Sequence, residues 1–233
     1  GYAGLTNKMV AKKVASICVA YPNMEAYFPK EKIKFTGNPV RKDILSLTAI
    51  KAEAIAHFNL NADKKTLLII GGSLGAKTIN ESIQAGINRF LEAGYQVLWQ
   101  TGKYYYEGIQ QTLGKLPEGL VVQPFIKRMD YAYACADVVI SRAGALSISE
   151  LCLAGKPSVL VPSPNVAEDH QTKNAMALVK EQAAIVVKDI QAREQLVDTT
   201  LALLADTAQQ QALSQHIKRL GKPEAANDIV KEI

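Results

Sequence analysis

Cysteine is scarce in this 233-residue sequence, and its three copies show no pairing pattern. Cys18, Cys135 and Cys152 are widely spaced in apolar surroundings, and no CxxC spacing occurs. The pattern predicts buried, reduced thiols and disfavours a disulfide framework or a zinc site. The three histidines are scattered, and the sequence has neither an HExxH nor an Asp-x-Asp pair. These absences argue against a divalent metal held by the protein.

Long apolar runs and runs of like charge are lacking as well. No stretch reaches about 18 apolar residues, so no transmembrane segment is predicted, and no signal-peptide pattern occurs. The net charge is +5, but the basic residues are dispersed, which favours an ordinary solvated surface over a nucleic-acid site. Apolar residues make up 48%, enough for a sizeable core. Because the sequence starts at Gly1 without a Met, we expect it to be part of a longer protein.

Short runs rich in β-branched residues alternate with helical patterns from about residue 66 onward. Strands are predicted at residues 15–20, 32–36, 66–70, 96–100, 120–123, 137–141, 158–161 and 184–187, and helices at 48–58, 78–93, 129–134, 147–154, 171–182 and from 193 on. This order predicts an α/β protein with an open parallel sheet covered by helices on both faces. Ligands of such sheets bind beyond the carboxyl ends of the strands, so the residues after each strand are the candidate site.

Two of these strand ends are followed by small-residue turns. After the buried run 66–70 comes Gly71-Gly-Ser-Leu-Gly-Ala-Lys77, whose glycines would let a ligand approach the backbone at a helix start. It is neither GxxxxGK[ST] nor a complete GxGxxG, so a plain turn is an equal alternative. Ser141-Arg-Ala-Gly-Ala-Leu-Ser-Ile-Ser-Glu150 is the second such turn. Here Ser147 and Glu150 have the spacing of a capping box, but the carboxylate could instead accept two ribose hydroxyls.

Three further segments could contribute to a site. Polar residues 167–174 follow a buried strand, where Asp169 could be an N-cap or the cluster could bind sugar hydroxyls. Phe125 and Ile126 could enclose a base or belong to the core. Arg41 follows Asn38-Pro39, a candidate boundary or hinge, and could reach a ligand or remain a surface residue.

Five stretches, taken in order, resemble the MurG family of bacterial N-acetylglucosaminyltransferases. They are residues 3–8, 37–41, 71–76, 141–150 and 169–175. The resemblance implies a GT-B fold, in which two Rossmann-like domains face a cleft, with this chain supplying the C-terminal parallel sheet and a remnant of the N-terminal domain. It implies UDP-N-acetylglucosamine (UDP-GlcNAc) as donor, undecaprenyl-diphospho-MurNAc-pentapeptide (lipid I) as acceptor, and no cofactor or metal.

The resemblance also implies a role for individual residues at the donor site. Arg41 and the backbone of Ile126 would lie at the uracil, and Glu150 would take the ribose hydroxyls. Gln171 would bind the GlcNAc hydroxyls. The diphosphate would contact Ser73 and the start of the helix that follows the second turn, at Ala145, Leu146 and Ser147. Gly144 would matter by letting the backbone approach the ligand.

One family feature is not in these 233 residues, namely the glycine-rich turn carrying a His proposed to act in catalysis. We therefore expect residues 1–40 to be a remnant of the acceptor domain, 41–222 the donor domain, and 223–233 a helix that crosses back. The expected behaviour is donor binding without turnover. The family further implies a cytoplasmic protein, peripheral on the inner membrane through the absent domain.

Three other functions stay open. They are a UDP-GlcNAc 2-epimerase, a noncatalytic nucleotide-binding module, and a dinucleotide-dependent oxidoreductase. The incomplete GxGxxG disfavours the last of these.

Overall fold

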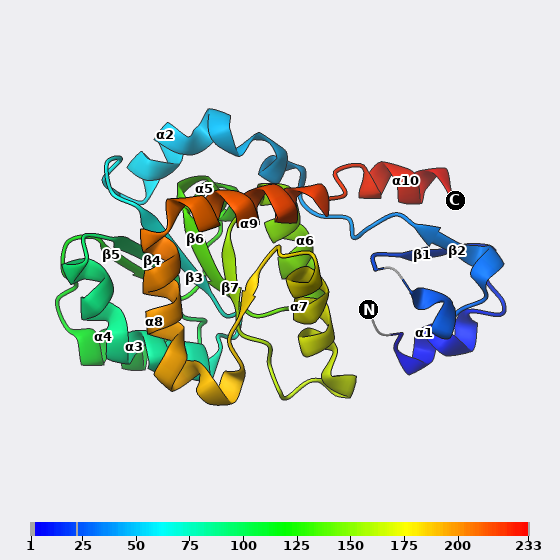
Figure 1. Cartoon of the computed structure of the whole chain (residues 1–233), viewed down its shortest axis with the longest axis horizontal. Helices are drawn as coiled ribbons and strands as arrows, with labels where there is room; N and C mark the ends of the chain where they lie inside the picture. Colours follow the sequence, from blue (N-terminus) through cyan, green and yellow to red (C-terminus); the bar gives the residue numbers. More distant parts are fainter. Residues whose placement is uncertain (1–2, 22, 233) are drawn as a thin grey trace.

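A six-stranded parallel sheet forms the centre of the computed structural model, which describes residues 3–21 and 23–232 (Figure 1). Its strands are β3 (Thr66–Ile70), β4 (Gln96–Gln100), β5 (Leu120–Gln123), β6 (Val138–Ser141), β7 (Ser158–Leu160) and β8 (Ile185–Val186). Their spatial order is β5-β4-β3-β6-β7-β8. This is the doubly wound order of a Rossmann fold, whose switch point lies between β3 and β6.

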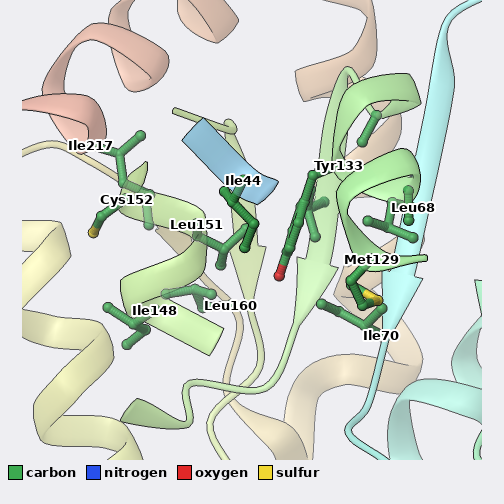
Figure 2. Close-up of a cluster of buried hydrophobic side chains, with 14 of the residues drawn as sticks. Ile44, Leu68, Ile70, Met129, Tyr133, Ile148, Leu151, Cys152, Leu160 and Ile217 are labelled. Carbon is green, nitrogen blue, oxygen red and sulfur yellow. The ribbon is translucent and has the colours of Figure 1, made fainter. Parts of the chain in front are cut away.

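Helices cover both faces of the sheet, and its central strands β3, β4 and β6 are buried along their whole length. Every residue of β3 is buried, and successive side chains point to opposite faces. Leu68 and Ile70 join one core, part of which Figure 2 shows, while Leu67 and Ile69 join the other. A strand buried on both sides reads in sequence as a continuous apolar run, which is the pattern that predicted it.

The helices divide between these two cores. The core of Figure 2 receives α2 (Leu47–His57), α5 (Met129–Cys135), α6 (Ala145–Ala154) and α7 (His170–Lys180); the other receives α3 (Lys77–Glu92), α4 (Tyr106–Leu113) and α8 (Ala192–Ala205). Helix α9 (Thr207–Arg219) contributes Leu213 to one core and Ile217 to the other. Short 3₁₀ turns lie at Met24–Ala26, Lys30–Lys32, Lys42–Ser46, Ala167–Asp169 and Asp189–Gln191.

A smaller N-terminal unit lies beside this body (Figure 1). It consists of α1 (Leu5–Val10) and two parallel strands, β1 (Ile17–Val19) and β2 (Ile33–Phe35), around a small apolar cluster. The last helix, α10 (Ala225–Lys231), reaches this unit. There the Ser16 hydroxyl donates to Glu232 Oε2 at 3.1 Å, and the Lys222 ammonium lies 4.5 Å from the centre of the Phe35 ring.

The structure contains all eight predicted strands and the predicted helices, and it adds α1 and α4, which were not among the predicted helices. The prediction that all three cysteines are buried was wrong for Cys18, which is exposed. Cys18 is the middle residue of β1, and alternate residues of a strand face opposite sides; Val19 points into the small cluster and Cys18 points away from it. In the described part of the chain, no helix is long and apolar enough to cross a membrane.

Candidate functional site

Two turns leave the sheet side by side at the switch point. Ile70, the last residue of β3, is in register with Ser141, the last residue of β6. The segment 71–76 and the segment 142–144 therefore start next to each other, and they lead into α3 and α6. Both turns that the sequence singled out lie where a doubly wound sheet binds its ligand.

The start of α6 is open. Gly144 is its N-cap residue, with φ −67° and ψ 150°, and no side chain caps the helix. A Cβ at Gly144 would have Ser147 Oγ, 3.7 Å away, as its nearest neighbour. Ala145 and Leu146 are exposed. The first amides of this helix are therefore accessible, and with the helix dipole they suit an anion such as a diphosphate.

The capping-box interpretation of Ser147 and Glu150 was wrong. Ser147 is the third residue of α6, so its hydroxyl is not at the N-cap. The Glu150 carboxylate has other partners: Oε1 accepts from Arg41 Nε at 3.1 Å, and Oε2 accepts from the Tyr133 hydroxyl at 3.1 Å. Burial, and then the negative charge of Glu150, raise the pKa of Tyr133. Two predicted site residues, Arg41 and Glu150, are thus brought together although 109 positions separate them.

The turn before α3 is built differently. Gly72 and Gly75 both have φ of +86°, a conformation that favours glycine. A Cβ at Gly75 would lie 2.1 Å from the carbonyl oxygen of Thr101, and one at Gly102 would lie 2.2 Å from the amide nitrogen of Gly75. Gly75 and Gly102 therefore allow the loop after β3 and the loop after β4 to pack backbone against backbone. Ser73 lies exposed at the tip of the turn.

Ile126 is buried, and its amide donates to Gln100 Oε1 at 2.8 Å. Gln100 Nε2 in turn donates to the carbonyl of Gly72 at 3.1 Å. The amide of Ile126 is therefore engaged inside the protein, which leaves its carbonyl as the backbone group for a base edge. Phe125, its neighbour, is 44% exposed. Gln100 was not singled out from the sequence. The available signal was an amide side chain at the carboxyl end of a predicted strand.

The first turn of α7 is tied to the loops after β6 and β7. Gln171 Oε1 accepts from the amide of Ser163 at 2.9 Å, and Asn174 Nδ2 donates to the carbonyl of Ala143 at 3.2 Å. Asp169 is the N-cap residue, but its side chain makes no capping hydrogen bond. Asp169 and Glu168 have φ of 50° and 56°, and two consecutive left-handed non-glycine residues store backbone strain at this rim.

A partly buried ion pair that the sequence did not reveal joins three loops at this end of the sheet. Arg142 Nη1 pairs with Asp189 Oδ1 and donates to the carbonyl of Val161 at 3.0 Å. Thr78, in the first turn of α3, donates to Asp189 Oδ2 at 2.9 Å. The Arg142 and Asp189 side chains are only 14% and 17% exposed. Through Asp189, this network joins the start of α3 to Arg142 in the turn that follows β6.

A cleft of about 680 Å³ separates the open helix start from the N-terminal unit. It is lined by Gly4 and Asn7 on one side and by Ala145, His170 and Asn174 on the other, among other residues. Asn38 bridges the two sides, since its Nδ2 donates to Ser149 Oγ at 3.0 Å. The volume is in the range of small-molecule sites. Among the described residues, no group of three His, Cys, Asp or Glu side chains is placed to hold a metal ion.

The doubly wound sheet, the open helix start at its switch point and the cleft toward a second α/β unit define a Rossmann-like domain of the GT-B class. Residues 66–231 match the family model described as "Glycosyltransferase family 28 C-terminal domain". The chain therefore belongs to glycosyltransferase family 28.

Two curated relatives carry the name UDP-N-acetylglucosamine--N-acetylmuramyl-(pentapeptide) pyrophosphoryl-undecaprenol N-acetylglucosamine transferase. The protein of Parabacteroides distasonis is 55% identical and that of Bacteroides thetaiotaomicron 53% identical, each over the whole chain. The chain spans 63% of the length of both relatives.

Solved structures give a consistent result. The crystal structure of Acinetobacter baumannii MurG is similar with a TM-score of 0.74 and 31% identity, over 98% of this chain and 62% of that one. A UDP-GlcNAc 2-epimerase from Neisseria meningitidis has a TM-score of 0.66 at 15% identity, over 97% of this chain and 62% of that one, which shows a shared fold alone.

Proposed function

We propose that the chain is the donor-binding part of an enzyme that transfers GlcNAc from UDP-GlcNAc to lipid I, giving lipid II for peptidoglycan. The observation that carries this proposal is the pairing of an open helix start with the Glu150 carboxylate one and a half turns further along α6. The names of relatives 53–55% identical to the chain supply the reaction.

The donor would bind across the switch point. The amides of Ala145, Leu146 and Ser147 would receive the diphosphate, with Gly144 leaving room for it and the exposed Ser73 hydroxyl facing it from the other turn. Glu150 would accept both ribose hydroxyls, since a carboxylate can accept several donors.

The uracil base and the GlcNAc group would lie on opposite sides of the ribose. Ile126 would read the uracil edge through its carbonyl, because its amide is already bound to Gln100. Arg41, held on Glu150, would lie between base and ribose. Gln171, whose Oε1 is engaged by Ser163, would offer its amide NH₂ group to a GlcNAc hydroxyl.

The reaction would be an inverting single displacement that forms a β-1,4 link. A base removes the proton of the muramoyl 4-hydroxyl while the anomeric carbon gains oxocarbenium character. Negative charge accumulates on the departing UDP, and the amides and dipole at the start of α6 are preorganised to stabilise it. The group that acts as the catalytic base would come from outside these 233 residues.

The proposed organisation assigns residues 1–40 to an acceptor-domain unit, 41–222 to the donor domain and 223–233 to a segment that returns to the first unit. The contact between Glu232 and Ser16 supports this return. The complete enzyme would work on the cytoplasmic face of the inner membrane, where its lipid-linked acceptor lies, as a peripheral protein.

Calorimetric titration of the chain with UDP-GlcNAc, UDP and ATP tests the proposal. UDP-GlcNAc and UDP should bind and ATP should not, and Glu150→Gln should weaken UDP binding at least about tenfold by removing a charged acceptor. Glu53→Gln is the matched control, because Glu53 also accepts a tyrosine hydroxyl but is exposed and on another helix.

Other outcomes would contradict the proposal. Equal binding of ATP and UDP would indicate a general nucleotide module. Formation of UDP-ManNAc from the donor alone would indicate an epimerase. Lipid II formation by these 233 residues alone would disprove the inference that the base lies elsewhere.

A further inference from the structure

The partner that holds Glu150 from inside the protein is Tyr133 on α5. Tyr133 is fully buried, within the apolar cluster between α6 and the sheet, and its hydroxyl is the one polar atom at the tip of the ring (Figure 2). That hydroxyl donates to Glu150 Oε2 at 3.1 Å. Burial and the neighbouring carboxylate raise its pKa, so the hydroxyl keeps its proton and remains a donor.

The two protein partners leave a defined part of the carboxylate free. An ionised carboxylate has two oxygens and about four lone-pair positions. Arg41 takes one position on Oε1 and Tyr133 takes one on Oε2. One position then remains on each oxygen, and this arrangement matches a pair of neighbouring hydroxyls.

The Tyr133 contact differs from the Arg41 contact in its rigidity. The Arg41 side chain is 43% exposed, so its guanidinium group contacts solvent and can move when a ligand binds. Tyr133 has no such freedom, because its ring is enclosed by packed side chains. The orientation of the carboxylate about its own axis is therefore set by Tyr133.

We infer that Tyr133 is a positioning residue, which orients Glu150 to recognise the cis-diol of a ribonucleotide and thereby makes the site selective for ribose over deoxyribose. This inference rests on the proposed role of Glu150 at the ribose. Tyr133 itself touches no ligand and acts through Glu150.

Titration of Tyr133→Phe with UDP and with 2′,3′-dideoxy-UDP tests the inference. Phe fills the same space without the hydroxyl, so Glu150 loses its fixed orientation and UDP affinity should fall about 5- to 10-fold, the worth of one ordinary hydrogen bond. Affinity for the dideoxy analogue should stay at the wild-type value, because that ligand has no diol to contact Glu150. Tyr131→Phe is the matched control: it removes a hydroxyl from the same helix, but one that donates to Glu53 at 2.7 Å.

The outcomes separate the inference from the proposed function. If the wild type binds both nucleotides equally, Glu150 is not at the ribose, and the role of Glu150 and the inference fail together. If the wild type discriminates and Tyr133→Phe discriminates equally well, the inference alone is wrong. An equal loss of affinity for both ligands, with a lowered melting temperature, would make Tyr133 a purely structural residue and would also overturn it.

Discussion

The turn between β3 and α3 and the turn between β6 and α6 lie next to each other, and the two use glycine in different ways. Gly75 has φ of +86° and no room for a Cβ, which would lie 2.1 Å from the Thr101 carbonyl. Gly144 has φ of −67°, a value open to any residue, and space around it. Gly75 is needed for the close packing of two loops, while Gly144 leaves the start of α6 accessible to a ligand.

The two helix starts therefore have different roles. The start of α3 is held by the packing of Gly75 on Gly102 and by the contact of Thr78 with Asp189. Neither helix start has a side-chain cap, but the start of α6 is free of such contacts and lines the cleft at Ala145. A fixed turn beside an open one gives a ligand a rigid wall and accessible amides, the condition for a preorganised anion site.

The largest expected effect is on folding, from Gly75→Ala. An alanine would have to adopt a left-handed conformation and displace the Thr101 backbone. The combined strain and overpacking should lower the free energy of unfolding by about 3 kcal/mol or more. Urea denaturation followed by circular dichroism measures this loss. A stability near the wild-type value would show that the first turn is as open as the second.

A somewhat smaller effect is expected from Asp189→Asn. The change leaves the partly buried charge of Arg142 with only neutral partners, so stability should fall by about 2 kcal/mol. Arg193→Gln serves as the control, because its ion pair with Glu81 is exposed to solvent and should contribute little to stability. Equal losses in the two variants would mean that the Arg142–Asp189 pair does not hold the start of α3.

The smallest effect is expected from Ser73→Ala. Ser73 is exposed at the tip of the first turn, so its removal should leave the melting temperature unchanged. Loss of one hydroxyl contact to the diphosphate should weaken UDP binding about threefold. Calorimetric titration checks the affinity, and an unchanged value would restrict the ligand to the second turn.

Sequence patterns predicted the sheet well because its strands are short apolar runs separated by clear turns. The prediction located β3 to its first and last residue, since burial on both faces makes four of its five residues apolar in an unbroken run. Helix α4 was not predicted, because it is only eight residues long and contains Gly108, which lowers helix propensity.

The partners within the site could not be predicted, because they depend on the order of strands in space. Arg142 and Asp189 are 47 positions apart and meet only because β6, β7 and β8 are neighbours. The same holds for Arg41 and Glu150. Motif spacing predicted the candidate site residues, which stay a prediction, while a capping box was the wrong local explanation for Glu150, whose partners are distant in sequence.

Gly144→Ala, measured for stability and for UDP affinity together, tests most directly the claim that the start of α6 is the diphosphate site. The backbone conformation accepts alanine, so stability should change by less than about 1 kcal/mol, the difference between glycine and alanine at an N-cap. The added methyl group would occupy the space reserved for the diphosphate, so UDP affinity should fall at least about tenfold. Wild-type affinity in a stable Gly144→Ala protein would contradict the account.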